Sequence, residues 1–163
     1  MPEIKMLVMD VDGTLTDGKI YMSNSGEAMK AFNIKDGYAI YQMLPENGIE
    51  PVIITGRESK IVELRCGELG IREIHQGCID KRSRMMEIAE RKGLQITDNG
   101  VIRGCAYIGD DLLDIPGMEI SEISGCPNDA ADKVKEVVDH VCEKAAGDGA
   151  VREFIEWIIK TCQ

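Results

Sequence analysis

A chain of 163 residues with 44% hydrophobic and 29% charged residues can form one domain with a hydrophobic core, and this composition excludes intrinsic disorder. The formal net charge of −10, without a basic cluster, argues against binding to nucleic acid or to an anionic membrane surface. No apolar run is long enough to span a bilayer, and the first residues lack a signal-peptide pattern. We therefore expect residues 1–163 to form a single cytoplasmic domain.

Apolar segments of strand length alternate along the chain with helical patterns. The segments expected to form strands are 4–9, 50–55, 72–76, 105–109 and 139–143. The segments expected to form helices are 36–48, 58–70, 80–93, 128–138 and 149–161, with Asp36 and Asp80 as candidate caps. The clearest strands are continuously apolar, as strands covered on both faces are. This order predicts an α/β, Rossmann-like, three-layer fold with a doubly wound parallel sheet.

Two segments interrupt this alternation. Residues 19–34 read as a β-hairpin around a Ser-Asn-Ser-Gly turn, inserted after the first strand. A hairpin in this place would overhang the carboxyl end of that strand. Residues 94–104 are a second small excursion, with Asn99-Gly100 as its turn, and we attach no function to it.

The six cysteines include no C-x-x-C pair, and the chain has only two histidines. This spacing does not resemble a zinc site. Without a secretory signal, we expect buried free thiols rather than disulfides.

Polar side chains gather directly after the expected strands, at the edge where open α/β sheets bind their ligands. In chain order they are Asp10, Asp12, Thr55, Arg57, Lys81, Asp110, Asp111 and Asp114, with Gly56 between Thr55 and Arg57. Five carboxylates in one small volume repel one another, so cations must accompany them. Lys81 supplies one positive charge, and a divalent ion that prefers oxygen ligands, Mg²⁺, supplies the other.

The same residues suit phosphoryl transfer. Asp10 can attack a phosphorus atom in line and form an aspartyl-phosphate. Asp12 can protonate the leaving oxygen and later activate water. Magnesium, a lysine and a threonine hydroxyl form surroundings that stabilise a phosphoryl group. The sequence therefore predicts an enzyme with Asp10 and Asp12 as its catalytic residues.

Two other interpretations of these acids fit less well. An EF-hand loop that began at Asp10 would need Asp or Asn at its fifth position and Glu at its twelfth, where this chain has Thr14 and Tyr21. A receiver-like signalling domain also places acids, a threonine and a lysine at strand ends. In a receiver the lysine comes last, whereas here Lys81 precedes the Gly-Asp-Asp segment.

At these residues the chain resembles the haloacid dehalogenase superfamily of phosphatases. The segments "DVDGT" and "ITG", then Lys81, then "GDDLLD" match its four motifs in order. The resemblance implies that Asp10, the backbone carbonyl of Asp12, and Asp110 hold Mg²⁺. It also assigns roles to the neighbouring residues. These are phosphate binding by Thr55, Gly56 and Lys81, and orientation of a metal-bound water or Lys81 by Asp111 and Asp114.

Most members of that superfamily carry a cap domain, for which this chain has no room. The flanking segments "DGTLTDGKIYMSNSGEAMKAFNIKDGYAI", "AYIGDDLLDIPGM" and "GDGAVREFIEWI" resemble the capless 3-deoxy-D-manno-octulosonate 8-phosphate (KDO 8-P) phosphatases. The resemblance implies a homotetramer that hydrolyses this sugar-acid phosphate in lipopolysaccharide biosynthesis. The hairpin 19–34 would join the oligomeric core, and residues 145–163 would reach a neighbour's active site. Candidate partners for the sugar carboxylate are Arg57, Arg65 and Arg152.

Two alternatives stay open at this point. A phosphatase of the sialic-acid type would act on a nine-carbon sugar acid 9-phosphate. That branch has Glu at the position of Arg57, so we favour the eight-carbon acid. A low-activity oligomerisation domain related to sugar-nucleotide synthetases is the second alternative, and the intact motifs argue against it.

Overall fold

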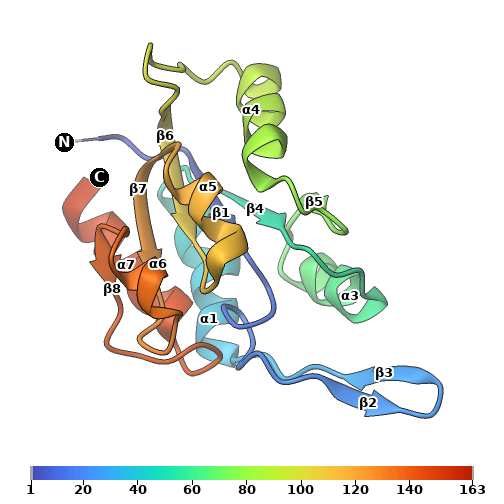
Figure 1. The fold of residues 1–163 in the computed structure, drawn as a ribbon. Helices are drawn as coiled ribbons and strands as arrows, with labels where there is room; N and C mark the ends of the chain where they lie inside the picture. Colours follow the sequence, from blue (N-terminus) through green and yellow to red (C-terminus); the bar gives the residue numbers. More distant parts are fainter. Residues whose placement is uncertain (1, 163) are drawn as a thin grey trace.

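The computed structural model describes residues 2–162 and contains a six-stranded sheet in the order β5-β4-β1-β6-β7-β8 (Figure 1). Every neighbouring pair in it is parallel. The strands are β1 (Met6–Met9), β4 (Glu50–Ile54), β5 (Glu73–His75), β6 (Ile102–Ile108), β7 (Ser121–Cys126) and β8 (His140–Val141). The predicted α/β fold with a parallel sheet is confirmed.

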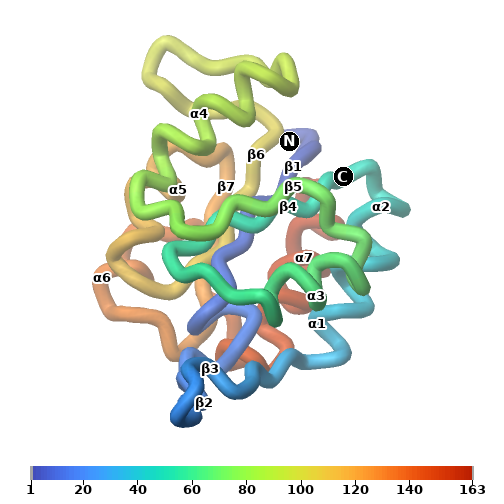
Figure 2. Tube along the Cα trace, turned by 90° about the vertical axis from the view of Figure 1, so that its right-hand side faces the viewer, coloured from blue at the N-terminus to red at the C-terminus, as the bar shows by residue number. Residues whose placement is uncertain are grey.

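Helices cover both faces of this sheet. They are α1 (Ile34–Tyr38), the π-helix η1 (Ala39–Met43), α2 (Leu44–Glu46), α3 (Lys60–Glu68), α4 (Lys81–Lys92), the 3₁₀-helix η2 (Leu112–Asp114), α5 (Ile115–Met118), α6 (Asp132–Lys135) and α7 (Ala150–Cys162). Figure 2 shows α4, α5 and α6 on one side of the strands, and α1, α3 and α7 on the other. The predicted three layers are therefore present.

Strand β1 shows why the sheet is buried on both faces. All four of its side chains are buried. Leu7 and Met9 belong to the core under α1, α3 and α7, whereas Met6 and Val8 belong to the core under α4, α5 and α6. Alternate residues of a strand point to opposite faces, so a continuous apolar run feeds both cores.

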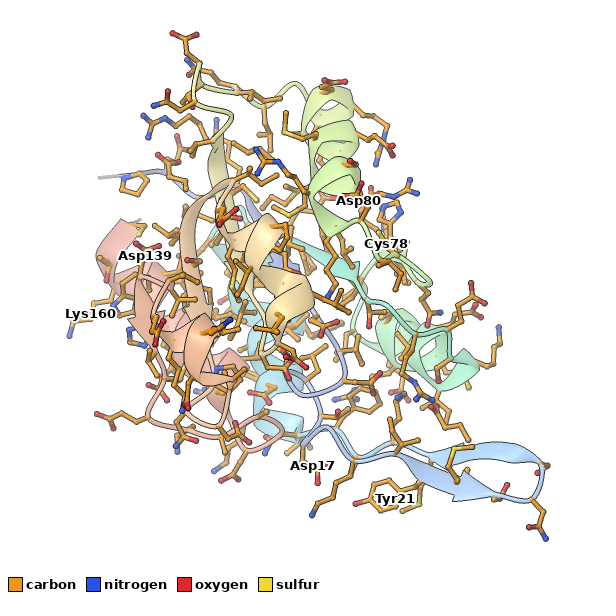
Figure 3. The ribbon with its side chains drawn as sticks, in the orientation of Figure 1. Asp17, Tyr21, Cys78, Asp80, Asp139 and Lys160 are labelled. Atoms are coloured by element: carbon orange, nitrogen blue, oxygen red, sulfur yellow. The ribbon has the colours of Figure 1, made fainter. Side chains whose placement is uncertain are left out.

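The hairpin predicted at 19–34 forms a separate two-stranded antiparallel sheet from β2 (Tyr21–Ser23) and β3 (Gly26–Met29). It projects from the body of the molecule, as Figures 1 and 3 show, with Tyr21 on its first strand. Met22 and Met29 are 65% and 53% exposed. The hairpin is the only sheet outside the main one among residues 2–162, which agrees with the prediction of a fold without a cap domain.

The sequence analysis missed β7, because its residues are not an apolar run. Ser121 and Ser124 are buried in this strand, and both hydroxyls are satisfied. Ser121 Oγ donates to Gly117 O at 2.9 Å, and Ser124 Oγ donates to Asp139 Oδ2 at 3.2 Å. Gly125 leaves room for Phe154, since a Cβ there would lie 2.4 Å from its ring. Small polar residues with internal partners therefore replace the expected aliphatic pattern.

Two of the predicted helix boundaries differ. The first helix begins earlier, at Ile34, and its cap is Asn33, whose Oδ1 accepts from Lys35 N at 2.8 Å. The prediction of Asp36 as that cap is therefore wrong. The helical pattern at 128–138 yields only the four residues of α6. In contrast, the cap predicted at Asp80 is confirmed, because its carboxylate accepts from Ser83 N at 3.0 Å.

No helix within residues 2–162 combines the length and the apolar character needed to cross a membrane.

Candidate active site

The carboxyl ends of β1, β4 and β6 bring their following residues to one place. In the sheet register Met9 pairs with both Ile53 and Ile108, so these strands end together. A cavity of about 240 Å³ lies at this edge. Its walls include Leu113 and all nine residues that the sequence analysis places after strands: Asp10, Asp12, Thr55, Gly56, Arg57, Lys81, Asp110, Asp111 and Asp114. The structure therefore gathers this set as expected.

Lys81 lies at the centre of the buried part of the site. It begins α4, and its side chain is 2% exposed. Its Nζ lies 3.1 Å from Asp10 Oδ1 and donates to Asp114 Oδ1 at 2.6 Å. Burial lowers the pKa of this ammonium, but the two carboxylates outweigh that effect and leave the pKa raised. Lys81 is therefore a permanent positive charge beside Asp10.

Asp114 has no acceptor position left for a metal ion. Oδ1 accepts from Lys81 Nζ and from the Tyr107 hydroxyl, both at 2.6 Å. Oδ2 accepts from the backbone N–H groups of Asp110 at 2.9 Å and Asp111 at 3.1 Å. Four donors occupy both lone pairs of each oxygen. Asp114 therefore fixes Lys81 and the loop after β6.

Asp10 and Asp110 are the carboxylates with capacity for a cation. Ligand oxygens of Asp10, Asp110 and Asp114 all lie within 4.8 Å of one another. Burial, Asp10 and Asp114 raise the pKa of Asp110 to about 8. The ionised form of Asp110 is therefore costly unless a cation lies beside it. An all-oxygen donor set fits Mg²⁺.

The backbone and a hydroxyl hold Asp110 in place. Thr14 Oγ1 donates to Asp110 Oδ1 at 3.0 Å. Gly13, with φ +86°, lies so close that a Cβ there would be 2.1 Å from Asp110 Oδ2. The "DGT" of the first motif therefore serves packing as well as chemistry, because only glycine leaves room for this carboxylate.

Asp12 lines the cavity where the base of the hairpin meets it. Lys30, which directly follows β3 and has a side chain only 2% exposed, forms an ion pair with Asp12. Lys30 Nζ also lies 3.3 Å from Glu27 Oε2. Arg57 lies 3.8 Å from Asp12 Oδ2 through Nε and 3.3 Å from Glu27 Oε2 through Nη2. Two acids and two bases therefore form a neutral cluster at the rim.

The sequence analysis did not identify Glu27 or Lys30. Their only local signal is the i, i+3 spacing of opposite charges within the hairpin, which is common on exposed surfaces. Burial raises the pKa of Glu27, but hydrogen bonds from Ser59 and Lys30 outweigh it and leave the pKa lowered. The Ser59 bond, at 2.6 Å, ties the hairpin to the loop after β4.

Arg65 and Arg152 do not line the cavity of their own chain. Arg65 lies over the Phe32 ring at 5.7 Å and pairs with Glu68 at 3.2 Å. Arg152 lies over the Tyr38 ring at 5.5 Å and donates to Glu156 at 2.7 Å. Of the three arginines expected to meet the sugar carboxylate, only Arg57 reaches the site within one chain.

One cavity is lined by an acid pair after the first strand, Thr-Gly after β4, a lysine at the start of α4 and two aspartates after β6. These features define a capless phosphatase of the haloacid dehalogenase superfamily. A solved hydrolase of that superfamily (subfamily III A) from Legionella pneumophila superposes with a TM-score of 0.89 at 34% identity, covering 98% of this chain and 84% of its own. No protein-family model matches the chain.

Two further relatives of this chain are both described as KDO 8-P phosphatases. The KDO 8-P phosphatase of Salmonella typhi is 44% identical over 156 residues, which are 96% of this chain and 79% of the relative. The solved KDO 8-P phosphatase from Moraxella catarrhalis, in complex with a magnesium ion, a phosphate ion and KDO, has a TM-score of 0.90 at 37% identity, with 99% and 88% of the two chains covered. This chain belongs to the 3-deoxy-D-manno-octulosonate 8-phosphate phosphatase family.

Proposed function

We propose that this chain is a magnesium-dependent phosphatase that hydrolyses KDO 8-P to KDO and inorganic phosphate. The observation that carries the proposal is the position of Asp10 in the cavity, with Oδ1 3.1 Å from Lys81 Nζ and a ligand oxygen within 4.8 Å of one from Asp110. The 44% identity to a KDO 8-P phosphatase supports this substrate. It does not favour the nine-carbon alternative or a domain without activity.

Three groups would hold the metal: the Asp10 carboxylate, the backbone carbonyl of Asp12, and the Asp110 carboxylate. When bound, Mg²⁺ would offset the negative charge of these acids and polarise a phosphoryl oxygen. Asp114 would keep the role that its four donors give it, which is to hold Lys81 and the loop of Asp110 and Asp111. Asp111 caps η2 by accepting from Leu112 N at 2.8 Å, so its part is also to shape this loop.

The reaction divides into two displacements at phosphorus. In the first, an Asp10 oxygen forms a bond to phosphorus, the bond to the sugar oxygen breaks, and Asp12 gives that oxygen its proton. Lys81, Gly56 and Thr55 hold the phosphoryl oxygens meanwhile. In the second, Asp12 takes a proton from water, whose oxygen attacks the aspartyl-phosphate and releases phosphate. Both acids return to their starting states.

Recognition of the sugar carboxylate begins with Arg57. Its side chain is 49% exposed at the rim, and the guanidinium can turn from Glu27 toward an incoming carboxylate. Arg65 and Arg152 lie away from their own cavity, so we assign them to the active site of a neighbouring subunit or to the interface that supports it.

We further propose that the chain forms a homotetramer in which the hairpin and residues 145–163 contact neighbours. The exposed apolar side chains of the hairpin and of α1 and η1 support this, since such patches mark interfaces. They are Met22, Met29, Ile34, Tyr38 and Tyr41.

Within this assembly, we propose that each chain acts as one domain. The cysteines in the described part of the chain are all free thiols, which supports a reducing, cytoplasmic location.

Phosphate release from a panel of sugar-acid and hexose phosphates tests the function. With Mg²⁺ present, KDO 8-P should give the highest kcat/KM, and a nine-carbon sugar acid 9-phosphate should rank below it. Excess EDTA should abolish turnover, and added Mg²⁺ should restore it. Full activity in EDTA, or a hexose phosphate as the best substrate, would contradict the proposal.

A further inference from the structure

A second group of metal-binding side chains lies away from the active site, between β8 and α7. His140 and Cys142 follow one another at alternate positions along β8 and its continuation, so both point toward the same face of the sheet. Glu153 faces them from the first turns of α7. One ligand atom from each of the three lies within 4.8 Å of the others. Figure 3 labels Asp139, the residue just before this group.

The His140 ring is held in place with one nitrogen free. It stacks on Trp157 at 4.6 Å between ring centroids and lies 6.1 Å from Phe154. Its Nε2 is buried and has no hydrogen-bond partner, and it lies 3.7 Å from Glu153 Oε1. A buried imidazole nitrogen without a hydrogen-bond partner is uncommon in folded proteins, because leaving it unpaired lowers stability. A metal ion would satisfy it.

The three donors suit a borderline-soft ion rather than Mg²⁺. Imidazole nitrogen, thiolate and carboxylate are the ligand types of Zn²⁺ sites, whereas the active site offers oxygen alone. One thiolate and one carboxylate balance the two positive charges of the ion, so the loaded site is neutral. His140 and Glu153 are 23% and 22% exposed, so water can reach a fourth position.

We propose that His140, Cys142 and Glu153 form a binding site for a zinc ion, with water as the fourth ligand. The site shares no residue with the magnesium site. It departs from the expectation drawn from cysteine spacing, because its His-x-Cys pair is on a strand and its third ligand comes eleven residues later, on a helix.

The ion would fix the Gly-rich loop that joins β8 to α7. Cys142 precedes this loop and Glu153 follows it. Glu153 already accepts from the backbone N–H groups of Glu143 at 2.8 Å and Lys144 at 3.0 Å, and each of its oxygens keeps a second lone pair. Burial raises the pKa of the Cys142 thiol far above its ordinary value, so zinc binding must release its proton.

Cobalt(II) provides a direct test, because a thiolate ligand gives it an intense charge-transfer absorption that oxygen ligands do not give. The full-length protein is titrated with Co²⁺ in excess Mg²⁺, and then with Zn²⁺. We expect the thiolate–cobalt band to saturate at one Co²⁺ per chain and to disappear when Zn²⁺ displaces the cobalt. Cys142→Ser and His140→Phe should lose it, and the phenyl ring keeps the stack on Trp157. Cys126→Ser is the matched control, since Cys126 is a buried thiol on the neighbouring strand that belongs to the opposite core.

Two further measurements separate binding from folding. Zinc should raise the melting temperature of the wild type and of Cys126→Ser, but not that of His140→Phe. Phosphatase activity with Mg²⁺ should be the same in the wild type and His140→Phe. The proposal would be overturned if the wild type showed no thiolate–cobalt band, or if His140→Phe and Cys142→Ser showed a band as strong as that of the wild type.

Discussion

At the scale of single residues, the site separates acids that react from acids that hold. Asp10 lines the cavity, has one oxygen near Lys81 and accepts from the backbone N–H of Val11, whereas Asp114 is saturated by four donors. Burial and Asp114 raise the pKa of Asp10, and Lys81 opposes this. The difference between the two aspartates lies in their partners, since both are buried carboxyl groups beside the same lysine.

Asp10→Asn is expected to abolish turnover, because an amide neither attacks phosphorus nor neutralises a metal ion. Asp12→Asn should lower kcat by about 10²–10⁴-fold through loss of proton transfer. Single-turnover assays with KDO 8-P measure both. Near-normal rates for a folded, purified Asp10→Asn protein would remove Asp10 as the nucleophile.

Lys30→Met should lower kcat/KM about ten- to a hundredfold, the effect of losing a charge-assisted bond to a group in the site. The reason is that buried Lys30 pairs with Asp12 and Glu27 and so fixes the hairpin base at the cavity. Lys19→Met is the control, since Lys19 lies on the same insertion but is 73% exposed. Equal kinetics for both variants would show that the hairpin base does not act on the site.

At the scale of elements, Asp36 joins the first helix to the last. It belongs to α1, is 1% exposed, and accepts from Arg152 N in the first turn of α7 at 2.9 Å. Next to this contact, Asn33 Nδ2 donates to Gly147 O at 3.3 Å, and a Cβ on Gly147 would lie 2.7 Å from Asp17 N. The Gly-rich loop therefore packs against its own chain at the base of the hairpin, where Figure 3 labels Asp17.

Asp36→Asn should remove a pH dependence of stability. Burial raises the pKa of Asp36 above its ordinary value of 3.8, although hydrogen bonds from the backbone N–H groups of Arg152 and Gly149 oppose this. A pKa that is higher in the folded protein than in the unfolded chain means that stability is lost as pH rises through the folded value. The wild-type free energy of unfolding should therefore be lower above that pH than at acidic pH, whereas the variant, whose amide does not ionise, should lack this loss.

Urea unfolding of both proteins from pH 4 to pH 8 measures this difference. Subtracting the two curves removes the titrations of the active-site acids, which the proteins share. Asp98 is exposed and serves as the control, so the difference in free energy of unfolding between the wild type and Asp98→Asn should not change with pH. A constant difference between the wild type and Asp36→Asn across this range would contradict the prediction.

At the scale of the whole molecule, the sheet is well covered, but the hairpin and α1 leave apolar side chains in solvent. Met22 is 65% exposed and Ile34 is 82% exposed. In the proposed tetramer, a neighbouring subunit would cover both the open site and this apolar surface.

We expect the wild type to have the mass of a tetramer in solution. Met22→Glu combined with Met29→Glu should lower this mass, because charged side chains cannot be buried in the interface without partners. In the same variant, kcat/KM for KDO 8-P should fall, whereas hydrolysis of a small aryl phosphate should persist. Light scattering with parallel assays measures both. A monomeric wild type with full activity on KDO 8-P would exclude the shared site.

The sequence by itself determined five of the six strands of the main sheet and most of the site. Asp10, Thr55 and Asp110 could be placed because each follows an apolar run, and parallel strands end at one edge whatever the loops do. Strand periodicity and motif order are local properties, so they can be read along the chain. Lys81 needed only the start of the next helix to be located.

Only the tertiary structure decided which distant side chains meet. It brought Lys30 to Asp12, turned Asp36 from an expected cap of its own helix into an acceptor for α7, and buried the polar strand β7. It also placed His140 beside Glu153. These contacts depend on how the hairpin folds back and how helices pack on the sheet, and neither leaves a periodic signal. Sequence analysis predicts that a charged side chain or a serine is exposed, because the partner that allows its burial is supplied only by tertiary packing.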